Sequence, residues 1–168
     1  ISLGLVGSEM CIRDRYLARQ IREDFGVDTE FLVGNLAWQP IEEINEFKAQ
    51  RISRRSPLEL LKLLQNSSIV LLHYVGYGYA KRGCPIWLVE GLEKWRRDND
   101  KKYLLTMFHE VYAYSSNILC SQFWTSPLQR NLAQRLVQLS DRCLTSKEGY
   151  AEIITRLTVS YTHLRAHE

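Results

Sequence analysis

The sequence predicts an α/β fold in which helices flank a parallel β-sheet. Short runs of β-branched and aliphatic residues alternate along the chain with longer segments of helical periodicity. The clearest run, Ile69–Leu72, has no polar alternation, which is typical of a strand buried on both faces of a parallel sheet. Such a sheet is built by right-handed crossovers, in which a helix follows each strand.

The composition fits one globular domain and excludes several classes of protein. The chain has 168 residues, 45% hydrophobic and 24% charged, and its net charge of +3 is too small to indicate a nucleic-acid partner. Its four cysteines form no CxxC pair, so the sequence indicates neither a zinc knuckle nor a disulfide framework and fits a reducing cytoplasm. No apolar stretch approaches the roughly 18 to 20 residues that span a bilayer.

The segment before residue 53 predicts a helix and two strands. Leu17, Ile21 and Phe25 recur every four residues, so we expect a helix over Tyr16–Phe25 that Gly26 ends. A strand over Thr29–Val33 follows at once. This order is the second half of a βαβ unit, and its first strand is expected to be missing. A second strand is expected over 47–52.

Later helices are predicted from start signals that resemble capping boxes. Ser56-Pro57-Leu58-Glu59 predicts a helix to Gln65 with Leu58, Leu61 and Leu64 on one face. Ser126-Pro127-Leu128-Gln129 predicts a helix to Leu139 with Leu128, Leu132, Leu136 and Leu139 as its stripe, and Thr145 to Glu148 predicts one to Leu157. A further helix is expected over Pro85–Asp98, with Lys94, Arg96, Arg97 and Asp98 in solvent. The remaining segments predict strands at Ile69–His73, Tyr103–Phe108 and Arg142–Leu144, and a loop at Ser115–Thr125.

The glycines after Ile69–Leu72 fit no standard nucleotide-binding motif. Gly78-x4-Gly83 is followed by Cys84-Pro85, so the lysine and hydroxyl of a Walker A loop are absent. Arg82 stands where a dinucleotide fingerprint needs its third glycine. Two interpretations stay open: a strand-to-helix turn, or an anion site at the start of the next helix, with Lys81 and Arg82 beside it.

Histidines end two of the predicted strands. His109-Glu110 begins a zincin-like sequence, but Ala113 stands at the position of the second metal ligand, so no metal site is expected. His73 ends the preceding strand in the same way. If the two strands are neighbours, both imidazoles reach one cleft, where histidine exchanges hydrogen bonds near pH 7. A Cys84 nucleophile with a histidine base is an alternative.

Several stretches together resemble the amino-terminal domain of bacterial GT-B glycosyltransferases of the GT4 type, which build polysaccharides or glycolipids. They are SIVLLHYVGYGYAKRGCPIWLVEGLEKW, LLTMFHEVYAYSSN, SQFWTSPLQRNLAQRL and LSDRCLTSKEGYAEII. The resemblance covers about residues 16–157. It implies a Rossmann-like domain that binds the acceptor and faces a second domain, which binds a nucleotide-sugar donor as co-substrate, with no other cofactor.

The resemblance also implies roles for individual residues. His109 matches the histidine that these enzymes place near the transferred sugar, which makes it the candidate catalytic residue. The acceptor side would be lined by His73, Tyr74, Gly76, Gly78, Tyr79 and Glu110, and bordered by the loop 115–125. The expected partners are a sugar or glycolipid acceptor and the donor domain, in the cytoplasm at the inner face of a membrane. A stand-alone small-ligand-binding module of the same fold is the other alternative.

Both ends of the chain differ from the middle. The opening ISLGLVGSEMCIRDR and the closing TVSYTHLRAHE resemble translated sequencing-adapter read-through. We therefore expect residues 1–15 and 158–168 to be foreign, and residues 16–157 to be a partial GT-B amino-terminal domain that is inactive alone.

Overall fold

The computed structural model describes residues 2–4, 8–38, 43–44, 47–97, 101–113 and 121–165. In this part of the chain a seven-stranded sheet has the order β3-β4-β2-β1-β5-β6-β7, and every neighbouring pair is parallel except β3 and β4. The strands are β1 (Ser2–Gly4), β2 (Phe31–Val33), β3 (Glu43–Ile44), β4 (Phe47–Arg51), β5 (Ile69–Tyr74), β6 (Tyr103–Phe108) and β7 (Arg142–Thr145). The predicted α/β class with a parallel sheet is confirmed.

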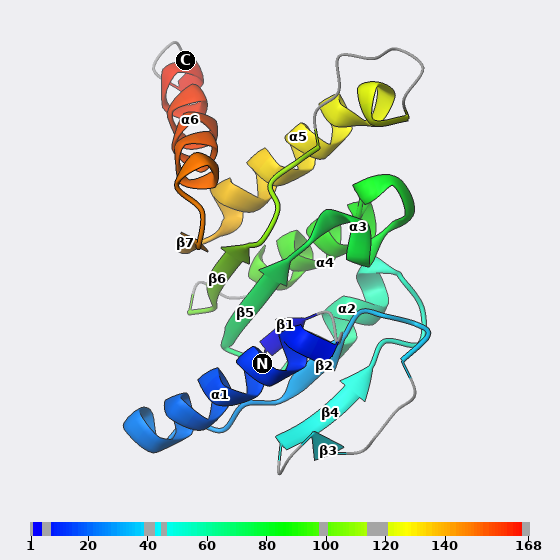
Figure 1. The fold of residues 1–168 in the computed structure, drawn as a ribbon, viewed down its shortest axis with the longest axis vertical. Helices are drawn as coiled ribbons and strands as arrows, with labels where there is room; N and C mark the ends of the chain where they lie inside the picture. The colour runs from blue at the N-terminus through cyan, green and yellow to red at the C-terminus, as the bar shows by residue number, and fades with distance from the viewer. Residues whose placement is uncertain are drawn as a thin grey trace.

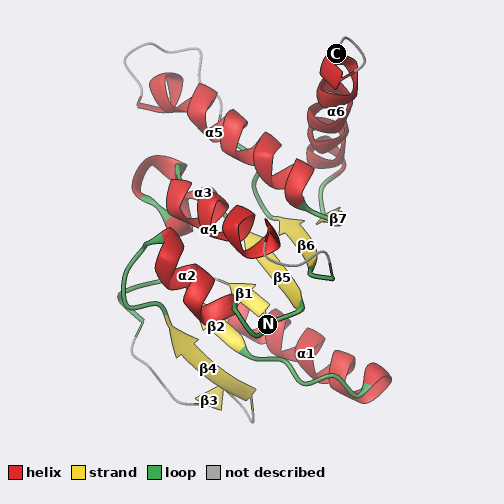
Figure 2. Ribbon diagram, turned by 180° about the vertical axis from the view of Figure 1, so that it is seen from behind, coloured by secondary structure: helices red, strands yellow, loops and turns green. Residues whose placement is uncertain are grey.

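Helices lie on both faces of this sheet (Figures 1 and 2). They are α1 (Ser8–Phe25), α2 (Pro57–Leu64), the single-turn α3 (Gly76–Tyr79), α4 (Ile86–Arg97), α5 (Ser121–Leu139) and α6 (Glu148–Arg165), with a 3-10 turn η1 at Lys81–Gly83. None of the helices within the described ranges is long and apolar enough to cross a membrane.

The main core lies on the face that α2, α4 and α5 cover, here called the α4 face. Alternate residues of β5 and β6, such as Val70, Leu72 and Leu104, are fully buried there. Trp95 of α4 packs among them and donates its indole N–H to the Ser67 carbonyl oxygen, 3.1 Å away. Burial of these side chains supplies most of the stabilisation of the fold.

The opposite face, here called the α1 face, is only partly covered. Ala18 of α1 packs against Phe31 of β2 and Phe47 of β4. In the described part of the chain no helix lies in front of β5 and β6 (Figure 1), so Ile69 remains 51% exposed and Tyr103 37% exposed. One half of this sheet face is therefore apolar and open.

The structure differs from the expectation for the start of the chain. A first strand was expected to be missing, but β1 pairs in parallel with both β2 and β5, and α1 begins at Ser8, not Tyr16. Without a strand at this position, the facing backbone groups of β2 and β5 would have no partners. The predicted end of the helix is confirmed, because Gly26 follows Phe25 with φ of +64°.

The predicted start of α2 is confirmed, since Ser56 is its N-cap and Pro57 its first residue, but the predicted capping box is absent. Ser56 makes no side-chain capping hydrogen bond, and the Glu59 carboxylate instead accepts a bond from the Ser53 N–H at 3.1 Å. The stripe of α2 is also shifted, since Leu60 and Leu64 are buried whereas Leu58 is 66% exposed.

Helix α5 begins at Ser121, within the predicted loop, and continues through Pro127. A proline inside a helix removes one backbone hydrogen bond and crowds the carbonyl four residues before it, and the packing of the following turns on the core compensates for this cost. Residues 114–120 of the predicted loop lie outside the described residues. Leu128, assigned to the apolar stripe, is 41% exposed, whereas Leu132 and Leu136 are fully buried.

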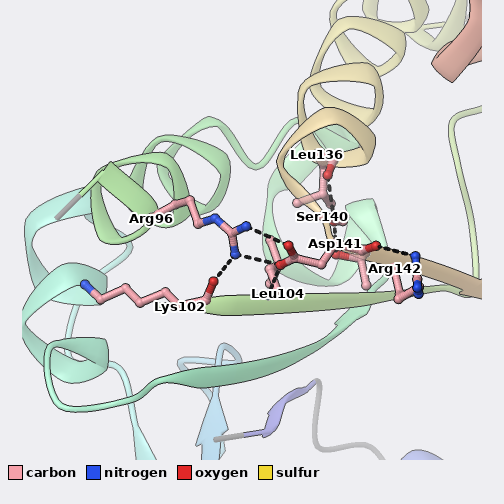
Figure 3. A network of polar contacts seen from close by, with 8 residues as sticks. Arg96, Lys102, Leu104, Leu136, Ser140, Asp141 and Arg142 are labelled. Atoms are coloured by element: carbon pink, nitrogen blue, oxygen red, sulfur yellow. Dashed lines mark hydrogen bonds and ion pairs between the residues drawn. The ribbon is translucent and has the colours of Figure 1, made fainter. Parts of the chain in front are cut away.

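A polar cluster joins α4, β6 and β7 at the amino end of β6 (Figure 3). The Arg96 guanidinium donates two hydrogen bonds of 2.6 Å to the Asp141 carboxylate and also reaches the Lys102 carbonyl oxygen. The same carboxylate accepts a bond from the Leu104 N–H at 2.7 Å. Arg96 was expected to lie in solvent, so this ion pair is a correction. The cluster fixes the end of the sheet opposite the candidate site.

Candidate functional site

The candidate site lies at the carboxyl ends of β5 and β6, beside the point where the strand order reverses. The chain moves outward in one direction from β1 to β2 and β4, and in the other from β5 to β6 and β7. Ligands of open α/β sheets bind outside the carboxyl ends of the strands at such a point. The residues that end β5 and follow β6 are His73-Tyr74 and His109-Glu110.

The two predicted histidines meet at this edge. Their strands are neighbours, as expected, and the His109 N–H donates a hydrogen bond to the Tyr74 carbonyl oxygen at 3.1 Å. Nδ1 of His73 lies 3.2 Å from Nε2 of His109, and the rings are nearly parallel, with an interplanar angle of 16°. His73 is only 3% exposed, whereas His109 is half-buried. His109 is therefore the member of the pair that a ligand can reach.

His73 is a neutral imidazole at pH 7. Burial, and after it the charge of His109, lower the pKa of His73 to about 4. Its Nε2 is buried without a hydrogen-bond partner in the described structure. A buried N–H group without a hydrogen-bond partner is rarer than a buried acceptor without one. We therefore treat the unpartnered Nε2 as the unprotonated nitrogen and assign the ring proton to Nδ1. In this tautomer Nδ1–H can donate to Nε2 of His109.

Asp14 of α1 approaches the same nitrogen. Its Oδ1 lies 3.3 Å from Nδ1 of His73, and burial raises the pKa of Asp14 to about 6. Although the geometry is that of an ion pair, burial penalises both charges, so the Asp14 oxygen is a second acceptor that competes with Nε2 of His109 for the single Nδ1–H of the neutral His73 ring. Asp14 belongs to the stretch that resembles adapter sequence, whereas both histidines belong to the stretches that resemble the glycosyltransferase family.

The predicted acceptor-binding tyrosines are core residues. Tyr79 is fully buried, and its hydroxyl donates to the His73 carbonyl oxygen at 2.8 Å. Tyr74 is 1% exposed, and its buried hydroxyl has no partner in the described structure. Burial raises the pKa values of both phenols above their usual range, so both stay protonated. These tyrosines hold the end of β5 in place and present no open surface to a ligand.

The glycines form a compact turn rather than an open loop. Gly76 is buried, and a Cβ on it would lie 3.0 Å from the Gly83 carbonyl oxygen. Gly78 is half-buried, and its carbonyl oxygen accepts a hydrogen bond from Arg55 at 3.3 Å. Of the predicted site residues, Glu110 is the one whose side chain is exposed.

Gln129 of α5 ties this turn to the segment after β6. Its side chain is 2% exposed; Oε1 accepts from the Ala113 N–H at 2.8 Å, and Nε2 donates to the Arg82 carbonyl oxygen at 2.7 Å. Arg82 has a left-handed φ of 66°, which is uncommon outside glycine. The sequence interpretation missed Gln129, because a glutamine three residues after a serine was taken for part of a helix cap.

Cys84 lacks the features of a nucleophile. Its thiol donates to the Arg82 carbonyl oxygen at 3.4 Å, and burial raises its pKa. A reactive cysteine needs a lowered pKa, so these observations disfavour the hydrolase alternative. Within the described residues, no group of three or more His, Cys, Asp or Glu side chains could hold a metal ion.

Comparison with known proteins adds no family to this picture. No protein-family model matches the chain, and no curated protein matches it.

Proposed function

We propose that this chain is the acceptor-binding amino-terminal domain of a bacterial GT-B glycosyltransferase of the GT4 type. Its full-length parent would transfer a sugar from a nucleotide-sugar to a glycan or glycolipid. One observation carries the proposal: His109 follows directly on β6, at the edge beside the reversal of strand order, in contact with His73 of the neighbouring strand.

The arrangement of the sheet supports this assignment. If the antiparallel edge strand β3 is left aside, the order β4-β2-β1-β5-β6-β7 corresponds to 3-2-1-4-5-6, the order of a Rossmann-like sheet, with Ser2–Gly4 of the adapter-like opening stretch in the place of its first strand. A fold alone does not determine function. The proposal therefore depends on the sequence around His73 and His109, which resembles the family at the same edge.

The two histidines would have different tasks. His109 is half-buried and would contact a sugar hydroxyl or stabilise charge at the reacting centre. His73 is neutral and buried, and its Nδ1–H would fix the orientation of the His109 ring, which makes it a positioning residue. Glu110 would border the acceptor.

The donor would be bound mainly by a second domain of the parent. The 168-residue chain is therefore expected to transfer no sugar and to hydrolyse no nucleotide-sugar. This is tested by incubating the purified chain with UDP-, GDP- and ADP-sugars and measuring nucleotide release. Appreciable turnover by the chain alone would contradict the proposal and favour a self-sufficient module.

The role of His109 is tested in the full-length parent. His109→Ala should lower kcat by about 100-fold or more, which is the usual effect of removing one acid–base or charge-stabilising group. Affinity for the donor, measured by calorimetry, should stay within twofold. Gln138→Ala, an exposed position on α5, is the control and should keep full activity. Full activity of His109→Ala would remove this residue from the site.

A further inference from the structure

A surface hollow lies between α5 and the segment that follows β6, three residues beyond His109. Its volume is about 480 Å³, within the usual range for small-molecule sites. The residues that line it carry mostly polar side chains: Tyr112, Ser126, Pro127, Arg130, Asn131 and Gln134.

Within the described residues, the polar side chains that line this hollow take no part in the hydrogen bonds and ion pairs of the fold. In the part of the chain that the structure describes, none of these side chains has a hydrogen-bond or ion-pair partner. Neighbours on the same helix behave differently, since Gln129 makes several hydrogen bonds and Arg135 pairs with Glu93 at 2.8 Å. Arg130, Asn131 and Gln134 of α5 therefore keep their hydrogen-bonding groups available at the hollow.

The lining indicates the chemistry of a ligand. Arg130 provides a cation with a planar set of donors, which suits a carboxylate or phosphate group. The amides of Asn131 and Gln134 can exchange hydrogen bonds with hydroxyl groups, as can the hydroxyl of Ser126. The Tyr112 ring and Pro127 offer apolar surface for the C–H face of a sugar ring. An anionic sugar satisfies all three kinds of contact.

We propose that this hollow binds an acidic sugar unit of the acceptor, that is, one that carries a carboxylate or a phosphate. The inference rests on the proposed function, because it names the chemical class of the acceptor. Binding of a sugar to the hollow can nevertheless be measured without any transfer reaction.

The test uses the 168-residue chain labelled with ¹⁵N. Glucuronate, glucose 6-phosphate, glucose and inorganic phosphate are titrated separately, and NMR shifts of the Ala113 and Asn131 amides are followed. Saturable shifts are expected with the two acidic sugars, with at least tenfold weaker binding of glucose and of inorganic phosphate. Comparing glucuronate with glucose 6-phosphate then distinguishes carboxylate from phosphate recognition. Equal binding of glucose, or of phosphate alone, would overturn the proposal.

Two variants locate the binding. Arg130→Gln should weaken binding of the acidic sugar by about 10-fold or more, since it removes a charged hydrogen bond. Gln134→Glu places a negative charge in the hollow at nearly constant volume and should abolish binding of the acidic sugars. Arg97→Gln, an exposed arginine on α4, is the matched control and should bind as wild type. Unchanged binding in both hollow variants would overturn the proposal.

The two proposals fail separately. If the acidic sugars do not bind while His109→Ala still abolishes transfer by the parent, the hollow proposal is wrong and the glycosyltransferase assignment stands. If the hollow binds acidic sugars but His109→Ala leaves transfer unchanged, the assignment of the reacting centre is wrong and the binding site stands.

Discussion

At the scale of single residues, Gln129 joins segments that are far apart in sequence. One side chain satisfies a backbone N–H of the segment after β6 and a backbone carbonyl of the glycine turn. It also lies close to Gly83, where an added Cβ would come within 2.9 Å of Nε2. The left-handed backbone at Arg82 and Gly83 is therefore maintained by a hydrogen bond from another element.

Replacing Gln129 should loosen the site. Gln129→Leu keeps a similar volume but leaves the Ala113 N–H without its partner and the Arg82 carbonyl with only the weak Cys84 thiol donor, which costs about 1–3 kcal/mol. Urea denaturation should show this loss of unfolding free energy, and the amides of residues 76–84 should exchange hydrogen faster. Gln138→Leu, at an exposed position of the same helix, should change neither quantity. If these amides exchange hydrogen at the wild-type rate in Gln129→Leu, the turn holds its conformation without this side chain.

The location of a single residue could be predicted where it follows from the residue's position at the end of a strand. His73 and His109 each follow an apolar run, and this pattern was enough to expect them at one edge of the sheet. It did not reveal that Tyr74 and Tyr79 are buried, because aromatic residues after a strand suit either a cleft or a core. Gln129 could not be found at all, since its burial depends on where α5 crosses the glycine turn.

At the scale of elements, strands were easier to predict than the starts of helices. The strand Tyr103–Phe108 has the predicted bounds, because five of its six residues are aliphatic or aromatic although only the alternate ones are buried. At Ser56 the helix start was right but the capping box does not form, whereas at Ser126 the start itself was wrong, because α5 begins at Ser121. Glu59 binds Ser53, and tertiary packing carries α5 through its proline.

The polar cluster around Asp141 joins three elements and gives stability that depends on pH. Hydrogen bonds from Arg96, together with the Leu104 N–H, hold the pKa of Asp141 below its usual range. A carboxyl whose pKa is lower in the folded than in the unfolded state stabilises the fold fully at pH values above its unfolded pKa, which is about 3.9. This contribution is lost as the pH falls through the pKa of the folded state.

Asp141→Asn should therefore destabilise the protein at pH 7 by about 1–2 kcal/mol, a modest value because the pair is partly exposed. The difference from wild type should shrink as the pH falls below about 4, where the wild-type carboxyl becomes protonated. Urea denaturation at several pH values measures both effects. Asp24→Asn, an exposed acid on α1, is the control. A difference that stays constant down to pH 3 would mean that the charge of Asp141 is not its source.

At the scale of the whole molecule, the two faces of the sheet are unequal. The α4 face is closed by helices, whereas the half of the α1 face formed by β5, β6 and β7 is open within the described residues. Ile69, Tyr103 and Leu144 are 51%, 37% and 46% exposed there, with Leu105 and Met107 half-buried between them. A groove of about 360 Å³ between α1 and β5 continues this surface. Contiguous apolar surface of this kind is unusual on a monomeric protein.

This open face should bind apolar probes. The chain is expected to enhance the fluorescence of an anilinonaphthalene dye while its near-UV circular dichroism shows fixed tertiary packing, which separates an exposed native face from a molten state. Ile69→Lys and Leu144→Lys should each reduce the enhancement by about half or more, since each places a charge on the apolar surface. Leu58→Lys changes a residue that is 66% exposed on α2, away from this face, and should leave the dye signal unchanged. An equal loss of fluorescence enhancement in all three variants would mean that the dye responds to general surface charge. If the wild-type chain gave no enhancement, this face would be covered in solution.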